Sequence, residues 1–146
     1  YAAGPKDLIA AMKKIQSQST SNPCSISQKA ALAALTGPQD CVTEMLQAFK
    51  RRHDLVLAGL NQIKGITCLP SDGTFYTFAD ASALIERLEG VKTDTELAAY
   101  WLDKAQVAIV PGSAFGLPGH FRLSFATSDA LLAKALKRLE NCCNTS

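Results

Sequence analysis

The chain has 146 residues, of which 47% are hydrophobic and 19% are charged, and its formal net charge is +2. This composition is typical of a globular protein, and the length suits one domain or a small domain with part of another. The basic residues are dispersed, so no basic stripe predicts a nucleic-acid partner. No run of about 18 apolar residues predicts a membrane span. We therefore expect neither a nucleic acid nor a membrane among the partners.

The first part of the chain predicts three helices. Pro5 suits the first turn of a helix, because a proline there loses no helical hydrogen bond. Gly37 and Pro38 are typical of a helix end. After them, apolar residues recur at helical spacing over one long segment, which predicts a helix of the kind that bridges two domains. The expected helices cover 5–17, 25–35 and 40–64.

Short strands and helices alternate after residue 65, which predicts helices laid on a small sheet, an α/β (α+β) arrangement. Thr93 and Glu96 form a capping-box pattern at the start of a helix. Another helix is expected over 82–88. The last helix is expected to begin after Ser128 and to bury Leu131, Leu132, Leu136 and Leu139. The expected strands are 66–68, 74–78, 107–110 and 121–125.

The cysteine pattern predicts free thiols and no metal site. Five cysteines are scattered along the chain, no Cys-x-x-Cys pair occurs, and neither histidine lies near a cysteine in the sequence. Free thiols are typical of a reducing compartment. We therefore expect a cytoplasmic protein without a zinc centre.

Arg122 stands out in the strand expected over 121–125. Because side chains alternate along a strand, Phe121, Leu123 and Phe125 share one face, and Arg122 and Ser124 share the other. The guanidinium group matches a carboxylate in bidentate fashion. The pattern alone leaves three interpretations open: an arginine on an edge strand, an arginine paired with an internal acid, or an arginine that binds a carboxylate ligand.

The segment 110–116 reads VPGSAFG, and the segment 121–126 reads FRLSFA. Together they resemble the C-terminal signature of class I aminotransferases of the aspartate aminotransferase type, which are pyridoxal-phosphate enzymes of fold type I. Three further segments also resemble this family. They are YAAGP at 1–5, QSTSNP at 18–23 with SISQ at 25–28, and Pro-x-x-Gly-x-Phe-Tyr at 70–76. The resemblance covers essentially the whole chain.

The resemblance implies site residues, domains and partners. Arg122 would bind the α-carboxylate of an amino-acid or 2-oxo-acid substrate, and Phe75 would line the substrate pocket. Ser21 and Asn22 would lie near the active site or the dimer interface of a homodimer. Residues 1–37 would be a remnant of the large cofactor-binding domain, 38–64 a linking helix, and 65–146 the small domain that closes over the substrate.

The sequence departs from the family because it lacks the lysine that would hold pyridoxal 5'-phosphate. None of the ten lysines has a context that resembles it, and no glycine-rich phosphate loop is present. We therefore expect no catalytic and no cofactor-binding residue here, and no transaminase activity without the missing large domain. Apolar faces of 1–37 left uncovered predict homo-oligomers. Two alternatives stay open: a non-catalytic binding or assembly module, or part of another fold-type I enzyme such as a lyase or a synthase.

Overall fold

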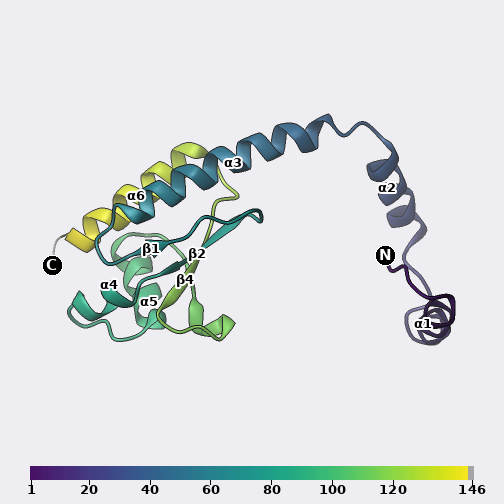
Figure 1. Ribbon diagram of the computed structural model, residues 1–146, viewed down its shortest axis with the longest axis horizontal. Helices are drawn as coiled ribbons and strands as arrows, with labels where there is room; N and C mark the ends of the chain where they lie inside the picture. The colour runs from purple at the N-terminus through teal and green to yellow at the C-terminus, as the bar shows by residue number, and fades with distance from the viewer. Residues whose placement is uncertain (145–146) are drawn as a thin grey trace. The chain divides into compact units, whose positions relative to one another are not determined.

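The computed structural model describes residues 1–144 and divides the chain into two compact units, Tyr1–Cys41 and the residues from Val42 onward. The first unit contains helices α1 (Lys6–Ser19) and α2 (Ser25–Thr36), which confirm the first two expected helices (Figure 1). No residue of α1 or α2 is buried. Their apolar side chains are therefore available for association, and the expected homo-oligomer stays a prediction.

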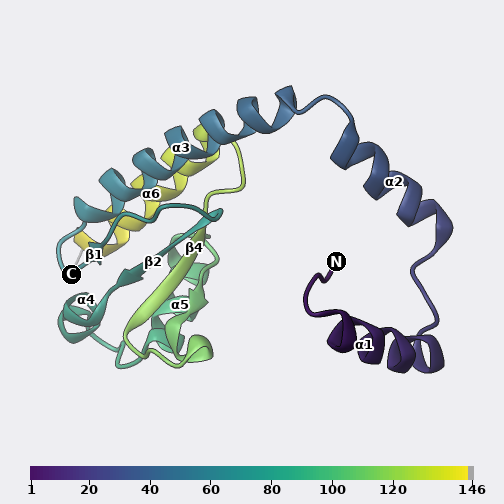
Figure 2. The same cartoon turned by 45° about the vertical axis from the view of Figure 1, so that its right-hand side comes forward.

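The second unit is built on a four-stranded antiparallel sheet (Figure 2). The strands lie in the order β1-β2-β4-β3, so β2 and β4 are central. Helices pack with this sheet, which confirms the expected fold class. The strands are β1 (Thr67–Cys68), β2 (Tyr76–Asp80), β3 (Val110–Pro111) and β4 (His120–Ser124), and the helices are α3 (Asp40–Asn61), α4 (Ser82–Arg87), α5 (Asp94–Lys104) and α6 (Asp129–Asn144).

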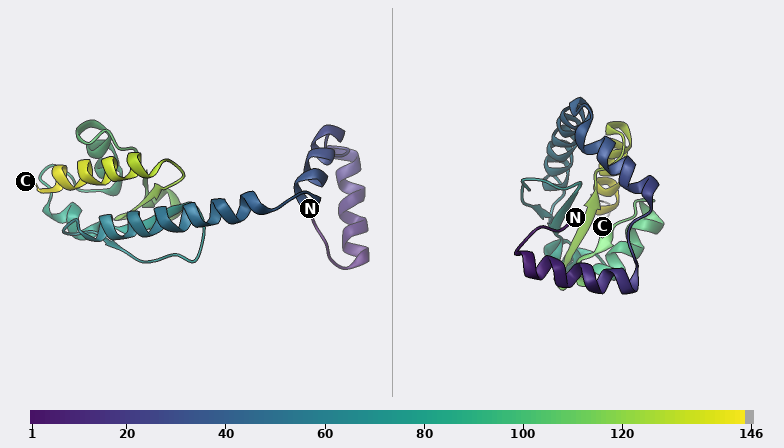
Figure 3. Two further views of the ribbon diagram at one scale, coloured as in Figure 1. Left: turned by 90° about the horizontal axis from the view of Figure 1, so that it is seen from above. Right: turned by 90° about the vertical axis from the view of Figure 1, so that its right-hand side faces the viewer.

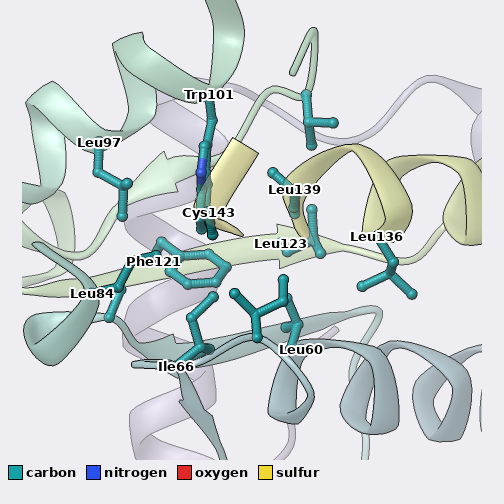
Figure 4. Packing of buried hydrophobic residues seen from close by; sticks show 14 of the residues in the cluster. Leu60, Ile66, Leu84, Leu97, Trp101, Phe121, Leu123, Leu136, Leu139 and Cys143 are labelled. Atoms are coloured by element: carbon teal, nitrogen blue, oxygen red, sulfur yellow. The ribbon is translucent and has the colours of Figure 1, made fainter. Parts of the chain in front are cut away.

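One face of the two central strands forms the floor of the hydrophobic core. Ala79 of β2 and Phe121 of β4 are fully buried on this face. Helices α3, α4, α5 and α6 all contribute side chains to the same cluster, including Leu60, Leu84 and Trp101 (Figure 4). The expected alternation along β4 is confirmed, because Phe121 and Leu123 are buried whereas Arg122 is only partly covered and Ser124 is exposed.

Helices α3 and α6 run side by side (Figures 1 and 3). Arg52 of α3 donates from Nε to Asp129 Oδ1 at 2.9 Å, and Arg51 donates to Oδ2 at 3.1 Å. These two hydrogen bonds, with Arg52 first, hold the pKa of Asp129 below its ordinary value. About two turns further along, Gly59 has no side chain, and a Cβ there would overlap Leu136. The glycine therefore lets the helices approach closely.

Two expected strands lie elsewhere. The strand expected over 74–78 is β2, Tyr76–Asp80, because Thr74 has a φ of 70° and cannot continue extended backbone. The strand expected over 107–110 is β3, Val110–Pro111. Pro111 lies beyond the expected strand, and it pairs with Phe121 in the register of β3 and β4. A proline is compatible with this position because β3 is an edge strand.

Two details of the expected helices are wrong. Helix α3 ends at Asn61 rather than at residue 64, because the backbone tightens into a turn in which the Ile63 N–H donates to the Leu60 carbonyl at 3.0 Å. The side-chain amide of Asn61 exchanges hydrogen bonds of 2.9 Å with both backbone groups of Cys68 in β1. Leu131 was expected in the core but is 56% exposed. Leu132, Leu136 and Leu139 follow the i, i+4, i+7 spacing of one helix face and are buried, and Leu131 lies about 100° away from that face.

The predicted domain limits 1–37, 38–64 and 65–146 stay a prediction. Within residues 1–144, no helix combines the length and hydropathy that a membrane crossing requires.

The buried thiol of Cys143 predicts a loss of stability at alkaline pH. Burial raises the pKa of Cys143 from 9.0 to about 11. The folded chain therefore holds the proton of this thiol more tightly than the unfolded chain does. The stability that the protonated thiol contributes to the folded state is complete below pH 9.0 and is lost as the pH rises towards about 11. The loss should reach up to about 3 kcal/mol in the free energy of unfolding. Urea denaturation of the wild type and of Cys143→Ala across this range measures it, and equal slopes in both proteins would contradict the prediction.

Candidate functional site

The face of the sheet opposite the core carries polar and aromatic side chains. Three cross-strand pairs lie on it: Tyr76 with Ser124, Phe78 with Arg122, and Asp80 with His120. Alternation along β2 and β4 sends the neighbouring residues into the core, so these six side chains must face outward. This face therefore gathers chemistry-bearing groups from two strands about 45 residues apart in the sequence.

Arg122 is a partly buried cation at the centre of this face. Its guanidinium carbon Cζ lies 5.1 Å from the ring centroid of Tyr76 and 4.8 Å from that of Phe115. Such contacts are attractive and orient the plane of the guanidinium group. Within residues 1–144, Arg122 forms no ion pair with a carboxylate. Because β4 is a central strand, the structure excludes both an edge-strand arginine and one paired with an acid of the described chain.

A tight turn places Phe115 against Arg122. The turn is the 3₁₀ helix η1 (Gly112–Phe115), which follows β3 directly. Gly112 is buried against β4, and a Cβ at this position would overlap the Leu117 carbonyl and His120. Gly116 closes the turn with a φ of 80°. The Phe115 ring also meets Phe78 edge-on, with centroids 6.0 Å apart.

Phe75, predicted to line a pocket, lies just before β2 and is 51% exposed. Its ring meets Tyr76 edge-on at 5.4 Å, and its carbonyl accepts a hydrogen bond of 2.8 Å from the Phe125 amide. The rings on the guanidinium group are those of Tyr76 and Phe115, which were not singled out from the sequence. Alternation from Arg122 across β2 could have indicated Tyr76, whereas Phe115 required the geometry of the turn. The pocket role of Phe75 stays a prediction.

Ser21 and Asn22 belong to the N-terminal unit, in the loop between α1 and α2. Both are exposed, and Ser21 adopts a φ of 63° while its N–H donates to the Gln16 carbonyl at 2.9 Å. Ser21 thus closes the end of α1. Their place near an active site or a dimer interface stays a prediction.

Asp80 and His120, which also lie on this face, are already engaged by other groups. The pKa of Asp80 lies below its ordinary value, first because the Ser82 N–H donates to the carboxylate at 2.8 Å, with smaller contributions from the Ser82 hydroxyl and from His120. The His120 ring stacks on Phe78, with centroids 5.4 Å apart and planes 20° apart. Arg122 is therefore the cation of this face that is left to bind an anion. A separate groove of about 400 Å³ near His53 and Phe125 does not include Arg122.

The sequence matches the family model described as aminotransferase class I and II over residues 1–139. The chain belongs to this family. It is 50% identical over 148 residues to an aspartate aminotransferase of Rhizobium meliloti, covering 99% of this chain and 36% of that protein. A crystal structure of the Rhizobium meliloti aspartate aminotransferase matches with a TM-score of 0.90 and 49% identity, covering 98% of this chain and 37% of that chain. The Thermus thermophilus aspartate aminotransferase with maleate matches with a TM-score of 0.83 and 39% identity, covering 96% and 35%.

This aminotransferase chain therefore spans about a third of the length of the relatives it matches. The family implies pyridoxal phosphate, which is held as a Schiff base by a lysine in a desolvated or charge-tuned site. All ten lysines of this chain are exposed. The pKa of Lys104 is raised, first by its hydrogen bond with Asp103, which is opposite to what a nucleophilic amine requires. The described residues therefore do not fit the cofactor-holding role. They also include no group of three or more residues that could hold a metal ion.

Proposed function

We propose that this chain is the substrate-carboxylate-binding part of an amino-acid aminotransferase of the aspartate aminotransferase type. The observation that carries the proposal is Arg122, a partly buried guanidinium group held between two aromatic rings and without an acid partner in the described chain. In the same proposal, pyridoxal phosphate is held by residues outside this chain and supplies the electron sink for the reaction. Because of the family resemblance, we also propose that the protein works as a homodimer in the cytoplasm.

Arg122 has the donor geometry that an α-carboxylate requires. Two parallel N–H groups of a guanidinium group can donate to the two oxygens of one carboxylate. Tyr76 and Phe115 restrict the orientation of the guanidinium plane, so less conformational entropy is lost on binding. The two rings also cover part of the cation, and an anion is attracted more strongly where less water surrounds the charge. We propose that the small domain, expected over 65–146, closes over the bound substrate, which would exclude water further.

Arg122→Gln should abolish carboxylate binding by this chain. Maleate is a suitable probe because the similar Thermus thermophilus enzyme has been solved with it. In the wild type, maleate should shift the Nε–H resonance of Arg122 in the ¹⁵N spectrum, with an affinity in the millimolar range. Arg122→Lys should bind more weakly than the wild type, because an ammonium group lacks the planar fork.

The diamide of maleic acid and the variant Arg51→Gln are the controls for this titration. The diamide has the same shape without charge and should not bind. Arg51→Gln removes the same charge from an exposed pair with Asp129 and should leave the affinity unchanged. Equal maleate affinity of the wild type and Arg122→Gln would show that Arg122 is not the carboxylate-binding group.

The purified chain should neither interconvert amino and 2-oxo acids nor form a specific Schiff base between one of its lysines and pyridoxal phosphate. The physical reason is that all ten lysines are exposed, whereas a lysine that holds the cofactor as a Schiff base needs a desolvated or charge-tuned site. Absorbance spectroscopy followed by borohydride reduction and peptide mass mapping checks this expectation. Stoichiometric trapping of the cofactor on a single lysine would contradict it.

A further inference from the structure

Asp94 is a buried carboxylate that the proposed function does not use. It is 3% exposed and is the one charged residue among the buried polar side chains of the described chain. It is the first residue of helix α5, where a negative charge is favoured by the helix dipole. The capping of α5 is performed by Thr93 and Glu96, whose side chains form a complete capping box. The Asp94 carboxylate is therefore not needed as the cap of α5.

The partner of the Asp94 carboxylate is the turn that carries Phe115. Asp94 Oδ2 accepts a hydrogen bond of 2.6 Å from the backbone N–H of Ser113, and Oδ1 accepts one of 3.1 Å from Thr95. Ser113 lies in η1, two residues before Phe115. A hydrogen bond to an ionised acceptor is shorter and roughly twice as strong as a neutral one. The bond thus fastens the turn to the start of α5.

We propose that Asp94 is a positioning residue for Arg122 and acts through this turn. The chain of contacts runs from the Asp94 carboxylate to the Ser113 N–H, along the turn to the Phe115 ring, and from that ring to the guanidinium carbon at 4.8 Å. Without the acceptor, the turn loses its attachment to α5, and Phe115 no longer restricts the guanidinium plane. The inference rests on the proposed carboxylate-binding role of Arg122.

The test compares Asp94→Ala, Asp94→Asn and Thr93→Ala with the wild-type chain by NMR. Asp94→Ala removes the acceptor, and Asp94→Asn keeps an acceptor oxygen without the charge. Thr93→Ala removes the cap of the same helix and leaves the bond between Asp94 and Ser113 in place. This control therefore distinguishes the effect of a destabilised α5 from the effect of a turn that has lost its attachment. Spectra are recorded where circular dichroism shows each variant to be folded. The readouts are the nuclear Overhauser contacts between Phe115 and Arg122, and the maleate dissociation constant.

In Asp94→Ala the Phe115–Arg122 contacts should weaken, and maleate affinity should fall roughly fivefold, the low end of typical coupling between two sites. Asp94→Asn should fall between this variant and the wild type, and Thr93→Ala should keep both readouts at wild-type values. Unchanged Phe115–Arg122 contacts in Asp94→Ala and Asp94→Asn overturn the inference. This readout does not depend on maleate, so it decides the inference also where the wild type fails to bind maleate and the proposed function fails. Unchanged maleate affinity in both variants, while Arg122→Gln has lost binding, overturns the inference and leaves the proposed function standing.

Discussion

Trp101→Ala is expected to lower the free energy of unfolding of the C-terminal unit by about 3–5 kcal/mol. Trp101 is fully buried in α5, and its ring meets that of Phe121 edge-on with centroids 5.0 Å apart (Figure 4). Truncation removes the largest fully buried side chain of the described core and leaves a cavity between α5 and β4. Urea denaturation measures the change. Circular dichroism is the signal to follow, because the variant lacks the only tryptophan of the chain and so cannot be followed by tryptophan fluorescence.

Two further variants make this prediction specific. Leu102→Ala alters the next residue of the same helix, which is 57% exposed, and should change the stability by only about 0.5 kcal/mol. Trp101→Phe keeps an aromatic ring and deletes the indole N–H, which is buried and has no hydrogen-bond partner among the described residues. Because no partnered donor is removed, this variant should lose clearly less stability than Trp101→Ala. A loss in Trp101→Ala no larger than that in Leu102→Ala would contradict the assigned core.

Gly112→Ala should both destabilise the chain and weaken carboxylate binding. The added methyl group would overlap the Leu117 carbonyl and His120, so the turn must move away from β4. Overpacking of this kind costs about 1–3 kcal/mol. Since the turn carries Phe115, its displacement should also release Arg122. Urea denaturation and the maleate titration of the Arg122 Nε–H measure the two effects.

Gly73→Ala is the matched control for Gly112→Ala. A Cβ at Gly73 meets no atom within 4 Å, and Gly73 is not among the residues with positive φ. This substitution should therefore change neither the stability nor the maleate affinity measurably. If Gly112→Ala behaves in the same way, the close approach of the turn to β4 is not needed at the site.

The surroundings of Arg122 could be predicted from the sequence only in part, for reasons that particular residues make clear. Alternation of side chains correctly placed Arg122 opposite Phe121 and Leu123, because a strand has a fixed period of two. It left open whether Arg122 had an acid partner, since the nearest carboxylate depends on which strands pair. Pairing of β4 with β2 answers this, because Asp80 lies opposite His120 and is engaged by Ser82.

The sequence by itself determined the family, the order and approximate limits of the helices, and the outward direction of Arg122. Those features depend on motifs and on periods that are set within a few residues. Only the tertiary structure decided what surrounds Arg122. Phe115 reaches it through a turn that Gly112 and Asp94 hold in place, and the bond from Ser113 to Asp94 spans 19 residues. Such contacts depend on how α5 packs beside β3 and β4, and packing between distant segments has no period that a sequence displays.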